Sequence, residues 1–382
     1  MFGTTSPFWR LSKARENGTF VQVAQSSTKK RTLSPSWEPV RVSMQRLCNG
    51  DLQRPLRLEV LHRESDDEFV PVGLIDTTAA VLLAPGAQLA LKHPRGKPKP
   101  VGTVMVQSAT VIAEPTFMEY LAGGLEISLV VGIDMTASNG EPTDPRSLHY
   151  RGGAAPNAYQ TALQAVGAVL APYDSDGRIP AYGYGALLPP YNVVSHCFAL
   201  GGSPDSPACD GVAGVLQAYD TALKSVRLSG PTCFAPLISA AAHAANAAAA
   251  SAAAAGSLSY SVLLIITDGD IMDMDNTINA LVHASRTPLS LVIVGVGDAD
   301  FAAMRFLDAD DGVLRGTAGA AVRDIVQFVR FSEYRGRASG ARLARDVLAE
   351  IPGQVCQFFM SAGVKPPPAR AHAAVTTDPT RV

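Results

Sequence analysis

The stretch Leu125-Glu126-Ile127-Ser128-Leu129-Val130-Val131-Gly132-Ile133-Asp134 decides the fold of the larger part of this chain. It is an apolar run that ends on a carboxylate, and residues 261–268 repeat the pattern, ending on Asp268. Continuous apolar strands of this kind are typical of parallel sheets that are buried on both faces. Stripes of apolar residues three and four positions apart predict helices at 159–170 and 212–226. Together with the apolar runs at 179–184, 289–295 and 325–331, they predict an α/β doubly wound, mostly parallel sheet.

The first part of the chain has a different rhythm. From residue 7 to about residue 113, apolar and polar positions alternate, as expected for antiparallel strands that turn one face to a core. We expect strands at residues 20–23, 40–42, 56–60 and 102–106, separated by turn clusters such as 33–36 and 48–51. The pattern predicts an all-β sandwich over residues 1–115.

An alanine tract at residues 240–255 lies inside the second domain, which we place at residues 116–363. Pro236 suits a helix start and Gly256 a helix stop, so the tract is expected to be helical. Alanine favours the helix but offers little apolar surface for packing. We interpret the tract as a lengthened helix or an Ala-rich insertion without a function of its own. Residues 364–382, which begin with a proline-rich segment, are expected to be a disordered tail.

Composition narrows the class of protein. The chain has 382 residues, which is enough for two domains with separate cores, and its formal charge of −2 gives no overall attraction to nucleic acid or membrane. Its five cysteines show no CxxC spacing, which indicates reduced thiols and argues against a zinc site or a disulfide framework. The start shows no signal peptide, Phe2 excludes myristoylation, and no apolar run approaches the roughly 20 residues of a membrane span. We therefore expect a cytoplasmic protein whose contact with the plasma membrane, if any, is peripheral.

Polar residues at three strand ends suggest a cation site. Asp134, Thr136 and Ser138 follow the first apolar run, Thr232 lies in a Gly-Pro-Thr turn before a helix, and Asp268 ends the second run. Ligands of doubly wound sheets bind outside the carboxyl ends of the strands, so these loops are expected to converge. Carboxylate and hydroxyl oxygens are the ligands that Mg2+ or Mn2+ prefers. The alternative is that the two aspartates only cap the following helices.

Several motifs resemble the copine family. They are Gly132-Ile133-Asp134-Met135-Thr136-Ala137-Ser138-Asn139-Gly140, Ser147-Leu148-His149-Tyr150, Tyr173-Asp174-Ser175-Asp176, Leu263-Leu264-Ile265-Ile266-Thr267-Asp268-Gly269 and Ile351-Pro352-Gly353-Gln354-Val355. The resemblance implies two C2 domains followed by a von Willebrand factor A-like domain, and calcium-dependent phospholipid binding, membrane trafficking and signalling. It also implies that the five site residues form a metal-ion-dependent adhesion site. Such a site binds an acidic residue of an intracellular partner protein.

The first domain departs from that family pattern. It resembles only the later part of the second C2 domain, so the fold expected there is a partial C2 sandwich. The calcium-binding aspartates of the family are replaced by Ser6 and by the run His62-Arg63-Glu64. Asp66, Asp67 and Glu68 follow, but we expect a solvated acidic loop there rather than a Ca2+ site.

The basic segment 92–99 is the remaining candidate for membrane contact. Each Lys or Arg near an anionic bilayer contributes on the order of 1 kcal/mol, so four of them predict weak attachment. A solvated loop is the alternative. The candidate contact residues are Lys92, Arg95, Lys97 and Lys99.

The leading hypothesis for function is a non-enzymatic binding and scaffold protein that binds partners through the cation site. The alternative is a phosphatase or phosphotransferase with Asp134 as nucleophile, but Thr136 stands where such enzymes need a second carboxylate. The sequence contains no Walker-type loop and no G-x-S-x-G elbow. A RING ligase is excluded because the chain lacks paired cysteines.

Overall fold

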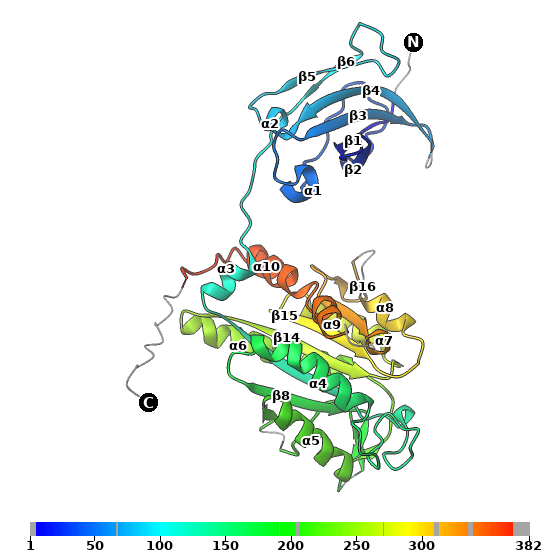
Figure 1. Ribbon diagram of the computed structural model, residues 1–382, viewed down its shortest axis with the longest axis vertical. Coiled ribbons are helices and arrows are strands. Elements are labelled where there is room, and N and C mark those ends of the chain that lie inside the picture. Colours follow the sequence, from blue (N-terminus) through cyan, green and yellow to red (C-terminus); the bar gives the residue numbers. More distant parts are fainter. Residues whose placement is uncertain are drawn as a thin grey trace. The chain divides into compact units, whose positions relative to one another are not determined.

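The computed structural model describes residues 5–65, 68–190, 192–203, 206–269, 271–308, 313–334 and 339–369. The chain divides into two compact units, residues 1–113 and 114–382, and each is described by itself (Figure 1). The boundary predicted from the sequence, after residue 115, lies two residues later than the boundary in the structure, after residue 113. Of the predicted tail, residues 370–382 lie outside the described part.

The first unit is built on an antiparallel sheet with strand order β2-β1-β3-β4. Its strands are β1 (Pro7–Ala14), β2 (Phe20–Gln25), β3 (Pro55–Arg63) and β4 (Phe69–Thr78), and a separate hairpin comprises β5 (Gln88–Leu91) and β6 (Gly102–Met105). Two short helices, α1 (Met44–Cys48) and α2 (Ala79–Leu82), lie between strands. Alternate residues of β3, namely Leu56, Leu58 and Val60, point into the core.

Two predictions for this unit need correction. Residues 40–42 are not a strand: they lie in an irregular segment before α1, and Ser43 caps that helix by accepting a hydrogen bond from the Arg46 amide. The prediction also missed β1, β4 and β5. In β1, buried residues come in pairs rather than alternating, so the strand lacks the period-two pattern, and its pairing with β2 shifts register between Leu11 and Ser12.

The second unit contains a mixed sheet with strand order β11-β8-β7-β14-β15-β18. The four inner pairs from β8 to β18 are parallel, whereas β11 and β12 pair with β8 in the antiparallel sense. The expectation of a sheet with helices is confirmed at this level. The strands are β7 (Leu125–Asp134), β8 (Arg178–Tyr184), β11 (Phe198–Ala199), β12 (Ala208–Asp210), β14 (Leu258–Thr267), β15 (Leu289–Gly295) and β18 (Val326–Arg330).

Helices cover both faces of this sheet (Figure 1). One face packs against α3 (Phe117–Ala122), α4 (Ala158–Leu170), α5 (Gly211–Ser225), α9 (Ser339–Val347) and α10 (Ile351–Ser361). The other packs against α6 (Ala235–Ala254), α7 (Met274–Ala284) and α8 (Ala302–Leu307). Successive side chains of a strand point to opposite faces, so in β14 Leu264 faces the first helix layer and Leu263 and Ile265 face the second.

Short elements complete the second unit. They are the 3-10 turns η1 (Ala137–Asn139), η2 (Ala171–Tyr173) and η3 (Phe331–Glu333), the small sheet of β9 (Ala186–Leu188), β10 (Val193–Ser195) and β13 (Arg227–Leu228), and the pair β16 (Arg315–Gly316) and β17 (Gly319–Ala320).

The alanine tract forms most of α6. Ala241, Ala242 and Ala245 are buried with Leu237 and Ile238 in the core, whereas most of the last two turns are exposed. The tract is therefore in part a core helix and not only an insertion. The helix is also long and apolar enough to match a membrane span, contrary to the expectation from sequence. That match rests on length and composition alone, and the buried residues pack α6 against the sheet.

A buried arginine joins the helix layers to the sheet. Arg323 donates hydrogen bonds to the backbone carbonyls of Ser285 (3.0 Å), Thr287 (2.6 Å) and Leu289 (2.7 Å). Its guanidinium also donates to the Tyr260 hydroxyl at 2.9 Å. Because Ser285 closes α7 and Leu289 opens β15, this one side chain fixes the turn between them.

Candidate metal-binding site

The candidate site lies where two neighbouring parallel strands end. Residues Ile133 of β7 and Ile266 of β14 are paired in register, so Asp134 and Thr267 follow side by side. The Thr267 hydroxyl donates to Asp134 Oδ2 at 2.9 Å. Thr267 was not among the residues predicted for the site. Thr267 stands directly before Asp268 at the end of a strand, and this position could have indicated that it belongs to the site.

The first three predicted residues meet through their oxygens. Asp134 Oδ1 accepts hydrogen bonds from the backbone amide of Thr136 (2.9 Å) and from its hydroxyl (2.6 Å). Thr136 Oγ1 lies 2.9 Å from Ser138 Oγ. Since the Thr136 proton points to Asp134, Ser138 is the donor of that second bond. Asp134 is fully buried and Ser138 is exposed, so the cluster opens to solvent on the Ser138 side.

A second set of side chains holds Thr136 in place. Asn139 Nδ2 lies 3.2 Å from Thr136 Oγ1 and donates to it, and Asn139 Oδ1 accepts a hydrogen bond from Tyr159 of α4 at 2.7 Å. The His149 ring stacks on Tyr159 at 4.3 Å and bonds to the Tyr219 hydroxyl of α5 at 2.7 Å. Burial lowers the pKa of His149 to about 3, so it is neutral near pH 7. The sequence did not predict a role for Asn139 or Tyr159 at the site. The two residues belong to different elements, η1 and α4, and only the fold brings them together.

Backbone contacts bring the Gly-Pro-Thr turn to the same place. Thr136 forms an isolated parallel bridge with Ser229, and the Ala137 amide donates to the Ser229 carbonyl at 2.6 Å. Thr232 is buried three residues further on. Gly185, directly after β8, has φ +79°, and a Cβ there would lie 2.2 Å from Thr136 Cγ2. Only glycine allows β8 and the Thr136 loop to approach so closely.

Charge at the site favours a cation. Burial, and after it the negative charge of Asp268, raise the pKa of Asp134 from 3.8 to about 7. Two acidic groups close enough to oppose each other's ionisation, beside two hydroxyl oxygens, form a donor set for a hard divalent cation. Among the described residues, no group of three or more His, Cys, Asp and Glu side chains could hold a metal. Hydroxyl oxygens must therefore supply part of any coordination here, which suits Mg2+ or Mn2+ and not Zn2+.

A neighbouring aspartate has a structural task. The two carboxylate oxygens of Asp273 each accept a hydrogen bond at 3.0 Å, from the backbone amides of Phe234 and Ala235. These amides open α6 and have no partner within the helix. Asp273 thus fixes the start of α6 directly after Thr232, and the Met272 amide bonds to the Thr232 carbonyl at 2.9 Å.

The other predicted residues belong to the first unit. All four candidate membrane contacts lie in the loop between β5 and β6 and are exposed; they are Lys92, Arg95, Lys97 and Lys99. Of the acidic cluster, Glu68 is exposed, and Asp66 and Asp67 lie outside the described residues.

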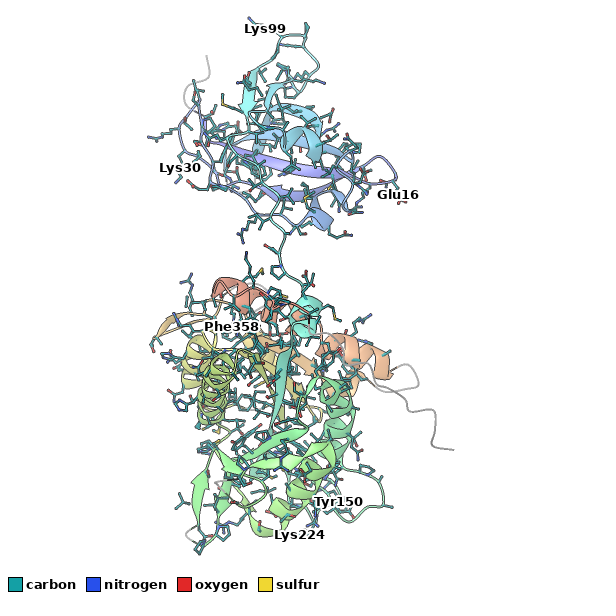
Figure 2. All side chains as sticks on the ribbon, turned by 90° about the vertical axis from the view of Figure 1, so that its left-hand side faces the viewer. Glu16, Lys30, Lys99, Tyr150, Lys224 and Phe358 are labelled. Carbon is teal, nitrogen blue, oxygen red and sulfur yellow. The ribbon has the colours of Figure 1, made fainter. Side chains whose placement is uncertain are left out.

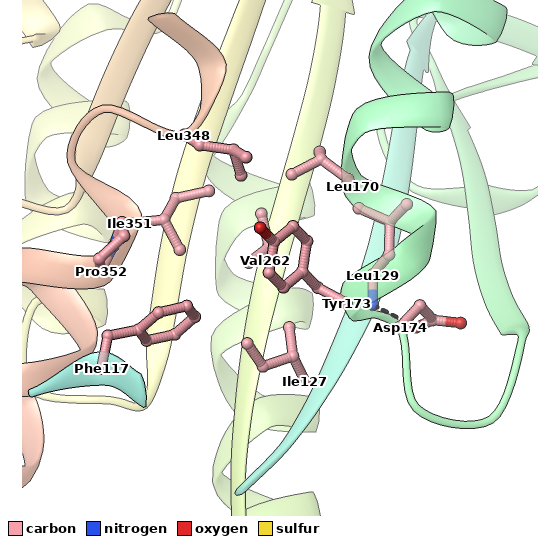
Figure 3. A pocket seen from close by; sticks show the side chains of 10 residues that line it. All are labelled: Phe117, Ile127, Leu129, Leu170, Tyr173, Asp174, Val262, Leu348, Ile351 and Pro352. Carbon is pink, nitrogen blue, oxygen red and sulfur yellow. Dashed lines mark hydrogen bonds between the residues drawn. The ribbon is translucent and has the colours of Figure 1, made fainter. Parts of the chain in front are cut away.

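A small apolar cavity lies in the second unit, toward the amino-terminal half of β7 and thus away from Asp134. Figure 3 shows Phe117 of α3, Tyr173 of η2 and Ile351 of α10 around it. Its volume is about 30 Å³, which is too small for an ordinary organic ligand. Asp174 is the only acidic residue among those that line it, and its Oδ1 accepts a hydrogen bond from the Leu129 amide at 2.8 Å.

Comparisons with known proteins give one family. The family model described as Copine matches residues 147–367, more than half of the chain. The match contains Thr232 and Asp268 but begins after Asp134, Thr136 and Ser138.

Solved structures give weaker similarities. The structure named BON1-C2B is 25% identical, covers 27% of this chain and 72% of its own, and has a TM-score of 0.24. The manganese-loaded TRAP protein of Plasmodium vivax is 12% identical, with 55% and 70% coverage and a TM-score of 0.31. The PilB minor pilin from Streptococcus sanguinis is 8% identical, with 91% and 87% coverage and a TM-score of 0.32. These scores are too low to support an argument about fold or function.

Proposed function

Because this chain belongs to the copine family, we propose that it is a non-enzymatic binding protein whose second unit recognises a carboxylate of a partner protein through a divalent cation. The residues proposed to hold the cation are Asp134, Thr136, Ser138, Thr232 and Asp268. In this proposal the second unit is a von Willebrand factor A-like domain and the first a partial C2 sandwich. The proposed setting is the cytoplasm.

One observation carries the proposal. The oxygens of Asp134, Thr136 and Ser138 lie within hydrogen-bonding distance of one another, and the negative charge of Asp268 acts on Asp134. The Thr136 hydroxyl donates to Asp134 and accepts from Asn139, which leaves it one lone pair. In the structure, the Ser138 hydroxyl donates to this remaining lone pair of Thr136 Oγ1. In the proposal, Mg2+ or Mn2+ replaces that hydrogen bond and coordinates the lone pair. The bound cation would supply a positive charge that attracts a carboxylate from solvent.

The geometry also bears on the enzymatic alternative. A nucleophilic aspartate needs a free oxygen at a substrate phosphorus, within about 3–3.5 Å. Asp134 is fully buried, and each of its carboxylate oxygens already accepts at least one hydrogen bond. These contacts suit an oriented metal ligand better than a nucleophile, so we do not adopt the phosphatase hypothesis.

Titration of the purified full chain with Mn2+ tests the proposal. We expect saturable binding that weakens at least about tenfold in Asp134→Ala. The matched control is Asp300→Ala, which removes an exposed carboxylate from the same unit and should leave binding unchanged. If Asp134→Ala does not fold, Thr136→Val removes one hydroxyl at nearly constant volume and should weaken binding as well.

A second measurement tests whether the bound cation accepts a carboxylate, which is the group proposed for the partner. Bound Mn2+ speeds the relaxation of water protons, and added acetate should lower that effect in the wild type by taking the open position. Mn2+ affinity equal to wild type in both site variants would refute the site. Asp134-dependent hydrolysis of p-nitrophenyl phosphate would favour the enzymatic alternative.

A further inference from the structure

One row of residues crosses the sheet of the second unit at the level of the candidate metal site. Asp134 follows the last residue pair of β7 and β14 and stands beside Thr267. Thr267 pairs with Gly295 of β15, and Gly295 pairs with Arg330 of β18. Neighbouring strands lie about 4.8 Å apart, so three strand spacings separate Asp134 from Arg330 by roughly 14 Å. Arg330 therefore ends its strand at the same edge of the sheet as Asp134.

The residues of this row also share one face of the sheet. Side chains alternate along a strand, and the four residues directly before the row belong to the core on the α4 side; they are Ile133, Ile266, Val294 and Val329. Asp134, Thr267 and Arg330 consequently point to the opposite face, which packs against α6, α7 and α8. A cation at Asp134 and the Arg330 guanidinium thus lie on the same side of the sheet.

An aromatic ring holds the Arg330 side chain. Arg330 Cζ lies 5.6 Å from the centroid of the Phe301 ring, within the range of a cation–π contact. Phe301 is fully buried, and two glycines make room for it, because a Cβ at Gly269 or at Gly295 would lie 2.5 Å from the ring. Gly269 directly follows Asp268. The ring that carries Arg330 therefore packs against the loop of the candidate metal site.

The Arg330 guanidinium has no anionic partner in the described part of the chain. No ion pair found there involves Arg330, and its Nε is enclosed without a hydrogen-bond acceptor. Arg305 of the neighbouring helix α8, by contrast, already pairs with Asp300 at 2.8 Å. An enclosed donor without an acceptor costs free energy, and a guanidinium matches the two oxygens of a carboxylate. Arg330 is only half-buried, so an acceptor can approach it from solvent.

We propose that Arg330 binds a second carboxylate of the partner protein, while the cation at Asp134 binds the first. The inference rests on the proposed function and makes it more specific. The partner must present two acidic side chains on the order of 14 Å apart, a distance that four residues of extended chain span on one side. Two linked contacts bind more tightly than either contact alone, so a partner with one acidic residue is disfavoured.

Two capped pentapeptides test this proposal on the full chain loaded with Mn2+. The first has aspartate at both ends and three serines between, and the second replaces the last aspartate with asparagine. Their affinities follow from the loss of the Mn2+ effect on the relaxation of water protons. The wild type should bind the first peptide at least about threefold more tightly than the second, and Arg330→Gln should bind both equally.

Two further variants separate the guanidinium from general charge. Arg330→Lys keeps the charge but not the planar fork, so it should retain only part of the preference for the first peptide. Lys224, labelled in Figure 2, is an exposed cation on α5, which contacts β8 on the side of β7 away from β18. Lys224→Gln should keep the full preference. Equal loss of the preference in Lys224→Gln and Arg330→Gln would overturn the proposal, because general charge would then explain it.

NMR in EDTA separates this inference from the proposed metal site. The Nε proton of Arg330 is identified by its absence in Arg330→Gln, and acetate at constant ionic strength should shift its signal saturably. A saturable shift in a chain that binds no Mn2+ would support the anion site and refute the metal site. Mn2+ binding without a shift, or with equal affinity for both peptides, would overturn the role of Arg330 alone. Inorganic phosphate that shifts the signal at lower concentration than acetate would assign the site to a free anion and also overturn it.

Discussion

Replacing Gly185 by alanine should damage the candidate metal site through the backbone of a neighbouring strand. Gly185 has φ +79°, and an added Cβ would lie 2.2 Å from Thr136 Cγ2. Such a separation is far below van der Waals contact, so Thr136 must move. Its hydroxyl would then leave Asp134 Oδ1, now at 2.6 Å, and Ser138 Oγ, now at 2.9 Å.

Two energies contribute to the expected loss of stability. Alanine in a left-handed conformation costs about 1–2 kcal/mol, and inserting a methyl group into a packed region costs about 1–3 kcal/mol more. Gly256→Ala is the matched control, because Gly256 has φ +71° but nothing lies within 4 Å of an added Cβ. The control should lose only the energy that the left-handed conformation costs, because its added methyl group meets no neighbouring atom.

Urea unfolding in EDTA and Mn2+ titration measure the two effects separately. We expect Gly185→Ala to lose about 2–5 kcal/mol of unfolding free energy and to bind Mn2+ at least about tenfold more weakly. Gly256→Ala should lose about 1–2 kcal/mol and keep its Mn2+ affinity. Equal stability and equal affinity in the two variants would refute the close contact between Gly185 and Thr136.

Two further predictions concern Arg323 and Asp134. Arg323→Met removes the guanidinium that donates to the backbone carbonyls of Ser285, Thr287 and Leu289, of which the Thr287 carbonyl keeps a hydrogen bond from the Leu289 amide at 2.8 Å. A buried carbonyl that loses its donor costs about 1–3 kcal/mol, so the midpoint in urea should fall well below that of the exposed control Arg315→Met; equal midpoints would contradict the role given to Arg323. In EDTA, the folded chain keeps a proton on Asp134 up to its pKa of about 7, whereas the unfolded chain releases it near 3.8. The free energy of unfolding should therefore fall as the pH rises from 4 through 7. Asp134→Asn should remove that slope, and an unchanged slope in this variant would show that another group causes it.

The sequence alone was sufficient for features that depend on neighbours along the chain. The apolar runs that end on Asp134 and Asp268 predicted buried parallel strands, because only a strand covered on both faces is apolar at every position. The stripe of 159–170 predicted α4 for the same local reason. The motif around Asp134, Thr136 and Ser138 follows one strand, so the sequence alone groups these three residues.

Local patterns failed where packing or sheet pairing decided the conformation. Residues 40–42 alternate like a strand, yet no neighbouring strand pairs with them in the described part of the chain. β1 lacks clean alternation, yet it pairs with both β2 and β3. Ala241, Ala242 and Ala245 in the middle of α6 are buried in the core, and nothing in an alanine tract shows which of its faces is covered.

What the sequence determined by itself is thus which residues end the strands and which kinds of ligand they offer. Only the tertiary structure decided how these residues are held: Thr267 on Asp134, Asn139 and Tyr159 on Thr136, and Gly185 at the point of closest approach. The physical reason is distance along the chain. Hydrogen bonds and steric contacts at the site join residues as far apart in the chain as Asp134 and Thr267, which are 133 positions apart. The register of the parallel strands brings these two together, and no local pattern specifies that register.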